Sequence, residues 1–169
     1  MHTNEMTDFV IRPARATDIS ALVDVLAAII DATGRDRPHD ADFVRQRYFD
    51  HPDQRACVVA VNEQDRALGF QALKYASVDN DYDVTPGWGI IGTHIHPAAH
   101  RRGVGRALFE ATQEAARRHA LPTIDATIGA DNQTGLAYYE AMGFRTYQRD
   151  ARVVRKRFDL QSAPARRNG

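Results

Sequence analysis

From Ile95 to Leu108 the chain reads Ile-His-Pro-Ala-Ala-His-Arg-Arg-Gly-Val-Gly-Arg-Ala-Leu, and this segment is the most informative about the fold. It follows an apolar run expected to be a strand (Trp88–Ile95) and opens an expected amphipathic helix (Gly103–His119). The first turn of a helix has unpaired N–H groups and the positive end of the dipole, and glycines let backbone approach a phosphate closely. Cationic donors stand beside this turn at Arg101, Arg102 and Arg106. The stretch therefore predicts a pyrophosphate site where the strand meets the helix.

Other phosphate-binding motifs do not fit this stretch. A dinucleotide fingerprint needs a third glycine where Leu108 stands, which counts against a nicotinamide oxidoreductase. A P-loop needs Gly-Lys-Ser or Gly-Lys-Thr, which the chain lacks. Taken alone, a Gly-x-Gly is also compatible with a tight strand-to-helix turn that binds nothing.

A second informative segment reads, from Ala130 to Phe144, Ala-Asp-Asn-Gln-Thr-Gly-Leu-Ala-Tyr-Tyr-Glu-Ala-Met-Gly-Phe. It predicts a helix over Asn132–Met142 that ends at the following glycine. Asn132 and Tyr139 are close to two helical turns apart, so their side chains fall on one face about 10 Å from each other. One extended ligand could touch both. Taken singly, the Asn is compatible with a helix cap and the Tyr with a packing aromatic.

Together the two segments resemble the signature motifs of the GNAT superfamily of N-acetyltransferases. The acetyl-CoA signature of that family starts with Gln or Arg, followed by two residues, Gly, one residue, and Gly or Ala. Gly103 and Gly105 match it, whereas His100 in the first position is a departure. The closing motif of the family places a Tyr seven residues after an Asn and then a Gly-Phe, which Asn132 and Tyr139 match.

The resemblance is clear over residues 88–147 and softer over the first strand and helix. It implies one N-acetyltransferase domain over residues 1–169, with an ordered core from about 9 to 160 and a frayed tail over 161–169. The implied fold class is α/β, an α+β mixed sheet of about seven strands flanked by about four helices. In this family the fourth and fifth strands splay apart.

The pattern of the chain agrees with this architecture. Strands are expected at Phe9–Ile11, Cys57–Val61, Ala67–Ala76, Trp88–Ile95, Thr123–Ile128, Phe144–Tyr147 and Arg152–Leu160. Helices are expected from Ile19 to Ile30, with Asp18 or Ser20 as cap and Gly34 as stop, and over Asp42–Phe49, Gly103–His119 and Asn132–Met142. The strand–helix–strand unit from Trp88 to Ile128 should be parallel, with a ligand at the carboxyl ends of its strands.

The resemblance also implies how acetyl-CoA, the acyl-donor cosubstrate, is bound and used. The implied binding residues are Thr93, His94, Ile95, Arg101, Arg102, Gly103, Val104, Gly105, Arg106, Asn132 and Tyr139. The amine would attack the thioester directly, and a backbone N–H at the end of the fourth strand would stabilise the developing oxyanion. Tyr139 would return a proton to the leaving thiolate as general acid. Its competitor Tyr138 is turned about 100° away on the helix.

The general base stays open at this point. Many members of the family carry a Glu on the fifth strand, five residues before the Asn, where this chain has Thr127, which cannot act as a base. Asp125 lies two residues earlier on the same face of the strand. The other candidates are His94, His96 and a water molecule.

The acceptor is expected to be the primary amine of a small molecule, and the sequence gives opposite hints about its charge. The loop Ser77–Gly87 could attract a cationic amine through Asp79, Asp81 and Asp83. The segment between the first two helices could instead meet an anionic substrate such as an amino acid, through Arg35, Arg37 and His39.

Two other functions stay compatible with the motifs. A protein or peptide N-acetyltransferase would need an open groove and a short Ser77–Gly87 loop. A non-catalytic acetyl-CoA-binding module would keep the glycine turn but would not need Tyr139, whose presence favours an enzyme. A homodimer through the last strands would be unsurprising.

Composition limits the other classes of partner. Lys and Arg number 22, as do Asp and Glu, and this balance argues against nucleic acid or an anionic membrane as partner. The longest apolar stretch, Ala21–Ile30, is interrupted by Asp24 and too short to span a bilayer, and the polar start Met1–Asp8 is not expected to be a signal peptide.

Cysteine usage points to a reducing compartment. The single cysteine, Cys57, permits no intrachain disulfide, which predicts a cytoplasmic protein. Its apolar run Cys57–Val61 is more typical of a small core residue than of a nucleophile. With neither a second cysteine nor a His-Glu-x-x-His, no metal is expected.

Overall fold

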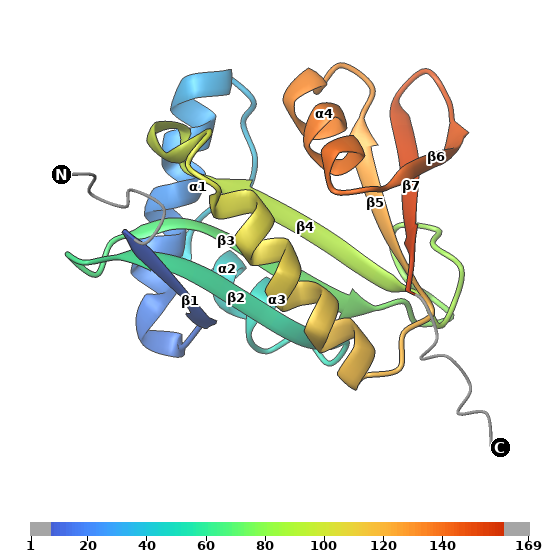
Figure 1. Ribbon diagram of the computed structural model, residues 1–169, viewed down its shortest axis with the longest axis horizontal. Coiled ribbons are helices and arrows are strands. Elements are labelled where there is room, and N and C mark those ends of the chain that lie inside the picture. Colours follow the sequence, from blue (N-terminus) through green and yellow to red (C-terminus); the bar gives the residue numbers. More distant parts are fainter. Residues whose placement is uncertain (1–7, 161–169) are drawn as a thin grey trace, which may run out of the picture.

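A seven-stranded mixed sheet organises the chain (Figure 1). The computed structural model describes residues 8–160; the tail expected to fray, 161–169, lies outside the described residues. The strands are β1 (Phe9–Pro13), β2 (Gln54–Asn62), β3 (Ala67–Tyr75), β4 (Gly89–Ile95), β5 (Thr123–Gly129), β6 (Arg145–Arg149) and β7 (Val153–Asp159). The helices are α1 (Ile19–Thr33), α2 (Ala41–Tyr48), α3 (Val104–Arg118) and α4 (Gln133–Ala141), with short 3-10 turns at η2 (Ala16–Asp18) and η3 (Pro97–Ala99). The expected fold class is confirmed.

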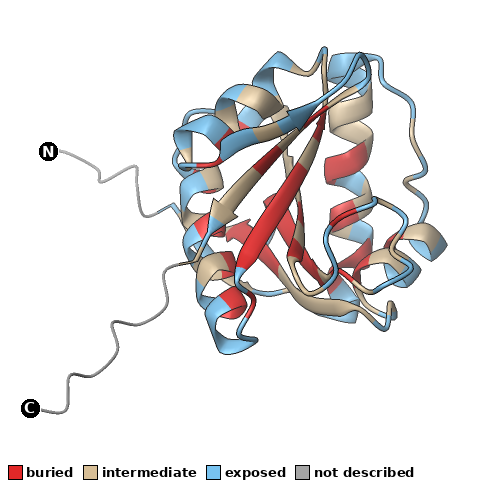
Figure 2. Ribbon diagram, turned by 90° about the vertical axis from the view of Figure 1, so that its right-hand side faces the viewer, coloured by how far each residue is buried: buried red, intermediate tan, exposed pale blue. Residues whose placement is uncertain are grey.

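Helices cover both faces of the sheet because the side chains of its strands alternate. On β2, Val59 and Val61 pack against α1 and α2, whereas Val58 and Ala60 pack against α3. Figure 2 shows the buried positions along the central strands and on the inward sides of the helices. Cys57 is packed against the α1 side, and burial raises the pKa of its thiol to about 12, which fits a core residue.

The strand order is β1-β2-β3-β4-β5-β7-β6, in which β4 and β5 are the parallel pair. Their register contains two residue pairs, Gly89 with Ile124 and Ile90 with Asp125. Beyond these pairs the strands diverge, as Figure 1 shows, so the expected splaying is confirmed. Over the rest of its length, β4 pairs with β3 on one side, and no strand among residues 8–160 pairs with it on the other.

The start of α1 differs in detail from expectation. Asp18 stands just before the helix, but its side chain does not cap it. The carboxylate instead accepts hydrogen bonds from the Arg12 guanidinium, at 2.7 and 2.8 Å, and from the backbone N–H of Arg15 at 2.7 Å. It therefore ties β1 to the turn that precedes α1. At the other end, α1 stops at Gly34 as expected.

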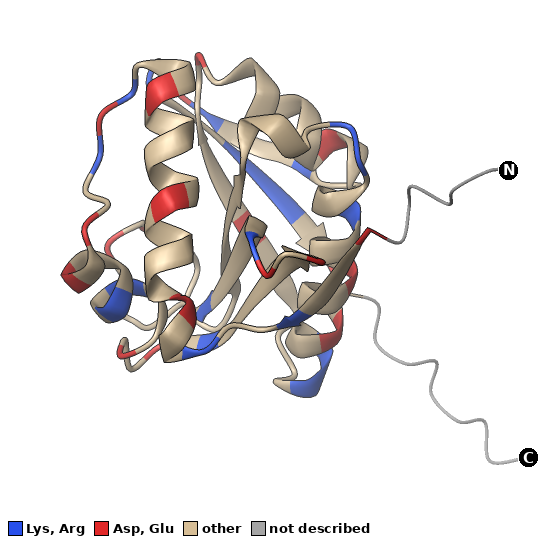
Figure 3. Cartoon of the chain, turned by 90° about the vertical axis from the view of Figure 1, so that its left-hand side faces the viewer, with Lys and Arg blue, Asp and Glu red and all other residues tan. Residues whose placement is uncertain are grey.

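Charge is mixed over the helices and loops. Figure 3 shows acidic and basic residues interspersed, with acidic but no basic positions along α1. Among residues 8–160, no helix combines the length and the apolar character needed to cross a bilayer. The edge strand β6 is the surface at which the homodimer would form, and that dimer stays a prediction.

Candidate active site

The glycine turn opens α3 with its amides free. Gly103 adopts the left-handed region, with φ of 81°, and directly precedes the helix. The first backbone bond of α3 runs from the N–H of Ala107 to the carbonyl of Gly103, at 3.1 Å. The amides of Val104 to Arg106 therefore have no carbonyl one turn earlier, and they stand at the positive end of the helix dipole. This arrangement fits the pyrophosphate that the sequence predicts here.

The second glycine of the motif, which is expected to let the backbone approach a phosphate, also has a packing role. A Cβ on Gly105 would lie 2.5 Å from Cε1 of Tyr138 and 3.0 Å from Cδ1 of Ile95. The hydroxyl of Tyr138 also donates to the carbonyl oxygen of Gly105 at 2.7 Å. Gly105 thus lets α4 pack on the first turn of α3, and its part in phosphate binding stays a prediction.

The arginines of the turn stay available for an anion. Arg101, Arg102 and Arg106 are all exposed. Arg102 lies 3.7 Å from the carboxylate of Asp8, a long and solvent-exposed pair that contributes little. His96, one of the candidates for the general base, caps η3, because its Nδ1 accepts a hydrogen bond from the N–H of Ala98.

Two tyrosines of α4 reach across to β3 and β4. The hydroxyl of Tyr139 lies 2.8 Å from Oγ1 of Thr93. The buried amide of Gln71 donates to Thr93 at 2.9 Å and to the hydroxyl of Tyr138 at 3.1 Å. Sequence reasoning missed Gln71, because a glutamine in an apolar strand is a weak signal. The hydroxyl of Tyr138 donates its proton to the carbonyl oxygen of Gly105, so Tyr139 is the better candidate for the general acid.

Burial shapes the acidity of both tyrosines. Tyr139 is 7% exposed, and desolvation raises its pKa above the ordinary tyrosine value. Desolvation likewise raises the pKa of Tyr138 to about 12. Both hydroxyls are therefore protonated at neutral pH. Asn132, the other residue of the motif, caps α4 by accepting from the N–H of Gly135 at 3.0 Å.

Asp125 and His94, two candidates for the general base, both form hydrogen bonds with neighbouring side chains. Asp125 is fully buried, and its oxygens accept from Tyr147 at 2.5 Å and from Thr127 at 2.7 Å; burial raises its pKa. His94 contacts Arg37 through Nδ1 and Tyr48 through Nε2. Burial, with the charge of Arg37 nearby, lowers the pKa of His94 to about 3, so the ring is a weak base.

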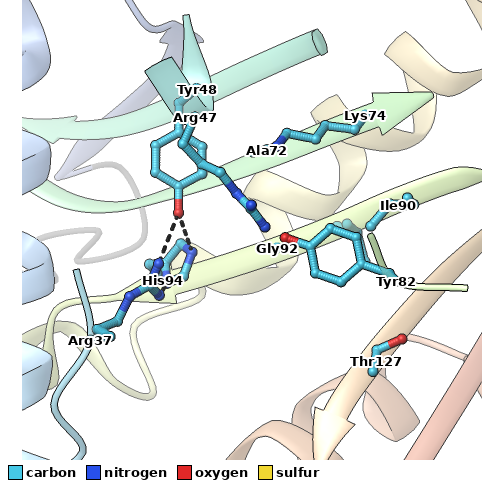
Figure 4. A pocket seen from close by; sticks show the side chains of 11 residues that line it. Arg37, Arg47, Tyr48, Ala72, Lys74, Tyr82, Ile90, Gly92, His94 and Thr127 are labelled. Carbon is cyan, nitrogen blue, oxygen red and sulfur yellow. Dashed lines mark hydrogen bonds between the residues drawn. The ribbon is translucent and has the colours of Figure 1, made fainter. Parts of the chain in front are cut away.

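A cavity of about 180 Å³ opens on the α1 and α2 side of the diverging strands (Figure 4). Gly92 and His94 of β4 and Thr127 of β5 line its floor. Its remaining wall includes Arg37, Arg47, Tyr48, Lys74 and Tyr82. Among these, Arg37 was anticipated from the sequence, whereas Arg47, Tyr48 and Lys74 were not.

The other charged residues singled out in the sequence lie outside this cavity. Arg35 pairs with Asp131 at 3.1 Å, and Nδ1 of His39 contacts the carbonyl of Arg37 at 3.0 Å. Asp79 and Asp81 line a second, smaller cavity of about 80 Å³ together with Asp53. The two cavities share a wall made by Arg47, Lys74, Tyr82 and Ile90.

The chain is similar to known acetyltransferases. The chain matches the Acetyltransferase (GNAT) family over residues 22–144. It is 28% identical over 98 residues to a mycothiol acetyltransferase of Renibacterium salmoninarum and 32% identical over 101 residues to one of Kocuria rhizophila. Each match covers 58% of this chain but 28% and 32% of the relative, so the chain spans less than a third of their length.

Solved structures share the fold. A GCN5-related N-acetyltransferase from Kribbella flavida superposes with a TM-score of 0.73 at 19% identity, over 90% of this chain and 98% of that one. A protein from Salmonella typhimurium, solved with its cofactor acetyl-CoA, gives a TM-score of 0.72 at 19% identity, over 94% and 98%. The family match covers most of the chain, and the chain therefore belongs to the GNAT family of acetyltransferases, as its two motifs predicted.

Proposed function

We propose that this acetyltransferase moves the acetyl group of acetyl-CoA onto the primary amine of a small molecule. The observation that carries the proposal is the division of the site by the diverging strands. The anion cradle of α3 and the tyrosines of α4 lie on one face, and the cavity lies on the other. Donor and acceptor can therefore approach the same segment of β4, from Gly92 to Ile95, from opposite sides.

The residues present fit acetyl-CoA, whose thioester supplies an activated acetyl group. The free amides of Val104 to Arg106 suit its phosphates. Along Thr93–Ile95, backbone groups that point away from β3 have no strand to pair with, so they can bind an extended, amide-containing chain. An N–H of this segment is also suited to stabilise negative charge that develops on a carbonyl oxygen.

Tyr139 is proposed as the general acid, oriented by a short chain of donors. Gln71 donates a hydrogen bond to the hydroxyl oxygen of Thr93, so the hydroxyl of Thr93 can in turn donate to the oxygen of Tyr139. The proton of Tyr139 is then free to point at the leaving sulfur. Because burial raises the pKa of Tyr139, the hydroxyl stays protonated until thiolate charge develops beside it.

The proton of the acceptor ammonium is proposed to leave through water in the cavity. Asp125 is not proposed as the base, because it is fully buried and accepts hydrogen bonds from Thr127 and Tyr147. The pKa of His94 is too low for it to take a proton from an ammonium. The cationic wall assists, since positive charge nearby lowers the pKa of an ammonium.

The cavity supports a small acceptor rather than a protein. Its volume of about 180 Å³ lies below the roughly 300–1,000 Å³ of pockets that hold drug-sized ligands. The loop Ser77–Gly87 is not short, and it places Tyr82 in the cavity wall. Asn80 holds this loop through hydrogen bonds to the backbone of Ser77, Tyr82 and Val84.

The proposal is tested by thermal denaturation with acetyl-CoA, beside NADH and ATP as controls, followed by thiol release from acetyl-CoA with a panel of amines. Acetyl-CoA at about 100 times its dissociation constant should stabilise the protein by roughly 2.7 kcal/mol. Selective stabilisation together with amine-dependent thiol release supports the proposal. Stabilisation with no thiol release by any small amine, but with acetylation of peptides, would assign a protein acceptor instead.

A further inference from the structure

The cavity wall is rich in hydrogen-bond donors and poor in acceptors. Three of its residues are cations: Arg37, Arg47 and Lys74. No carboxylate lines it within the part of the chain that the structure describes. Thr127 adds no proton donor, because it gives its proton to Asp125.

The histidine and tyrosine at the end of the cavity continue this pattern (Figure 4). Arg37 can only donate, so Nδ1 of His94 accepts at 3.4 Å and the neutral ring carries its proton on Nε2. That proton goes to the oxygen of Tyr48, 3.3 Å away, which also accepts from Arg37 at 3.3 Å. The hydroxyl proton of Tyr48 is thereby left to donate into the cavity.

The three cations have no anionic partner in residues 8–160, where no carboxylate lies within 4.0 Å of any of them. Lys74 is 6% exposed. Burial, with the charge of Arg47 nearby, lowers the pKa of Lys74 to about 8, and the more distant carboxylates of Asp53 and Asp81 offset this only in part. An anion placed among these groups would supply the missing partner.

Aromatic contacts hold the two guanidinium groups in place without neutralising them. Arg47 stacks over the ring of Tyr82 with 5.0 Å between its Cζ and the ring centroid, and Arg37 over Phe43 at 5.7 Å. Planar donors oriented in this way suit a carboxylate, which can accept two parallel N–H bonds.

We propose that the acceptor is an amine that also carries an anionic group, with an amino carboxylic acid as the fitting class, and that Arg37, Arg47 and Lys74 bind this group. The inference deepens the proposed function and rests on it. It also chooses between the two charges that the sequence suggests for the acceptor, in favour of an anionic group. The carboxylates of the Ser77–Gly87 loop line the neighbouring cavity and not the one that reaches Gly92 and Thr127. Arg47 and Lys74 stand in the wall between the two cavities, and Arg37 adds a third cation on the side of Gly92 and Thr127.

The test compares matched acceptors in the thiol-release assay. Each standard amino acid is run beside its α-amide and its decarboxylated amine, with aminoalkylphosphonates and spermidine as further arms. For the best acid, kcat/KM should exceed that of its amide and of its decarboxylated amine by at least tenfold. Equal rates for acid and amide, or a preference for spermidine, would overturn the inference while leaving the proposed function standing. A phosphonate preference would keep the anion site but reassign the acid.

Variants separate the anion site from general damage. Arg47→Gln and Lys74→Met should lower kcat/KM for the acid roughly 10- to 100-fold more than for its amide, which loses only the effect of the positive charge on the pKa of its ammonium. Arg45→Gln is the matched control, since Arg45 is exposed on the same helix and does not line the cavity. A uniform loss for acid and amide in both variants would refute the assignment of these side chains.

A binding measurement covers the case in which no free amine releases thiol. Titration calorimetry of N-acetyl amino acids, the reaction products, into the CoA-loaded protein should show tighter binding than for their uncharged amides, by at least tenfold. Arg47→Gln should remove this difference. Selective binding without turnover would keep the anion site and end the proposed function, whereas equal binding of acid and amide would end the inference.

Discussion

The contact between Gly105 and Tyr138 makes the sharpest prediction, because it links the acetyl-CoA motif to the helix that carries Tyr139. Replacing Gly105 by Ala would put a Cβ 2.5 Å from Cε1 of Tyr138 and 3.0 Å from Cδ1 of Ile95. The ring of Tyr138 cannot swing aside freely, because its hydroxyl bonds both the carbonyl of Gly105 and the amide of Gln71. The substitution must therefore move α4 or break these bonds.

The expected change in the free energy of unfolding combines two destabilising contributions and one stabilising contribution. Overpacking costs about 1–3 kcal/mol, and each of the two hydrogen bonds at risk contributes about 0.5–1.5 kcal/mol. Alanine regains at most about 1 kcal/mol over glycine in a helix, and less in the first turn. We expect Gly105→Ala to lower the free energy of unfolding by about 2 kcal/mol, and to lower kcat because Tyr139 moves with its neighbour.

Urea denaturation of Gly105→Ala, Tyr138→Leu and the double variant measures this coupling. The shorter leucine vacates the space of the ring, so the double variant should be more stable than the sum of the single changes predicts, by at least 1 kcal/mol. Gly103→Ala is the control, because open space surrounds its Cβ and its strain is confined to the backbone. A Gly105→Ala protein as stable as the wild type, or strictly additive costs, would refute this packing role for Gly105.

Three further predictions follow from the site and its surroundings. Tyr139→Phe should reduce kcat by roughly 100-fold or more in the thiol-release assay, whereas Tyr138→Phe, which keeps the ring, should change it by less than about tenfold; equal losses would remove Tyr139 from its role as acid. Hydrogen bonds from Arg12 and Arg15 lower the pKa of Asp18, so their contribution is present above the unfolded carboxyl pKa and is lost as pH falls through the lowered folded value. Asp18→Asn should thus cost about 1–3 kcal/mol in urea denaturation at pH 7, and this difference from wild type should shrink below about pH 4; a difference that persists in acid would show another cause. Burial lowers the pKa of Lys74, so Lys74→Met should raise Tm of the ligand-free protein below about pH 8, with a gain that fades as pH rises toward the unfolded lysine pKa of about 10.4; a lower Tm would mean that the charge is already compensated.

Local sequence patterns are enough to predict most of the helices and strands. The two-residue alternation of β2, the apolar stripe of α3 and the helix-ending glycine at Gly34 are properties of contiguous residues, and each predicted element is present. The left-handed conformation at Gly103 likewise fits a position that needs glycine. The splaying of β4 from β5 was different, because it was known from family resemblance and not from periodicity.

Contacts between distant residues account for what sequence reasoning missed. Gln71 meets Thr93 and Tyr138 across 22 and 67 positions of the chain, a distance at which no local spacing signals a partnership. Asp18 or Ser20 was expected to cap α1, but the carboxylate of Asp18 accepts charge-assisted hydrogen bonds from the guanidinium of Arg12 on β1 instead.

The family, the helices and strands, and the positions of the two motifs could all be predicted from the sequence, because they depend on residues that are neighbours in the chain. The charge of the acceptor cavity, in contrast, depends on how distant segments pack together. Arg37 precedes α2, Arg47 belongs to α2 and Lys74 to β3, and the sequence offers acidic and basic residues in equal number. Which of them share one cavity depends on how α2 packs on the sheet and on the two-residue alternation of β3, since a one-residue slip would turn Lys74 to the opposite face.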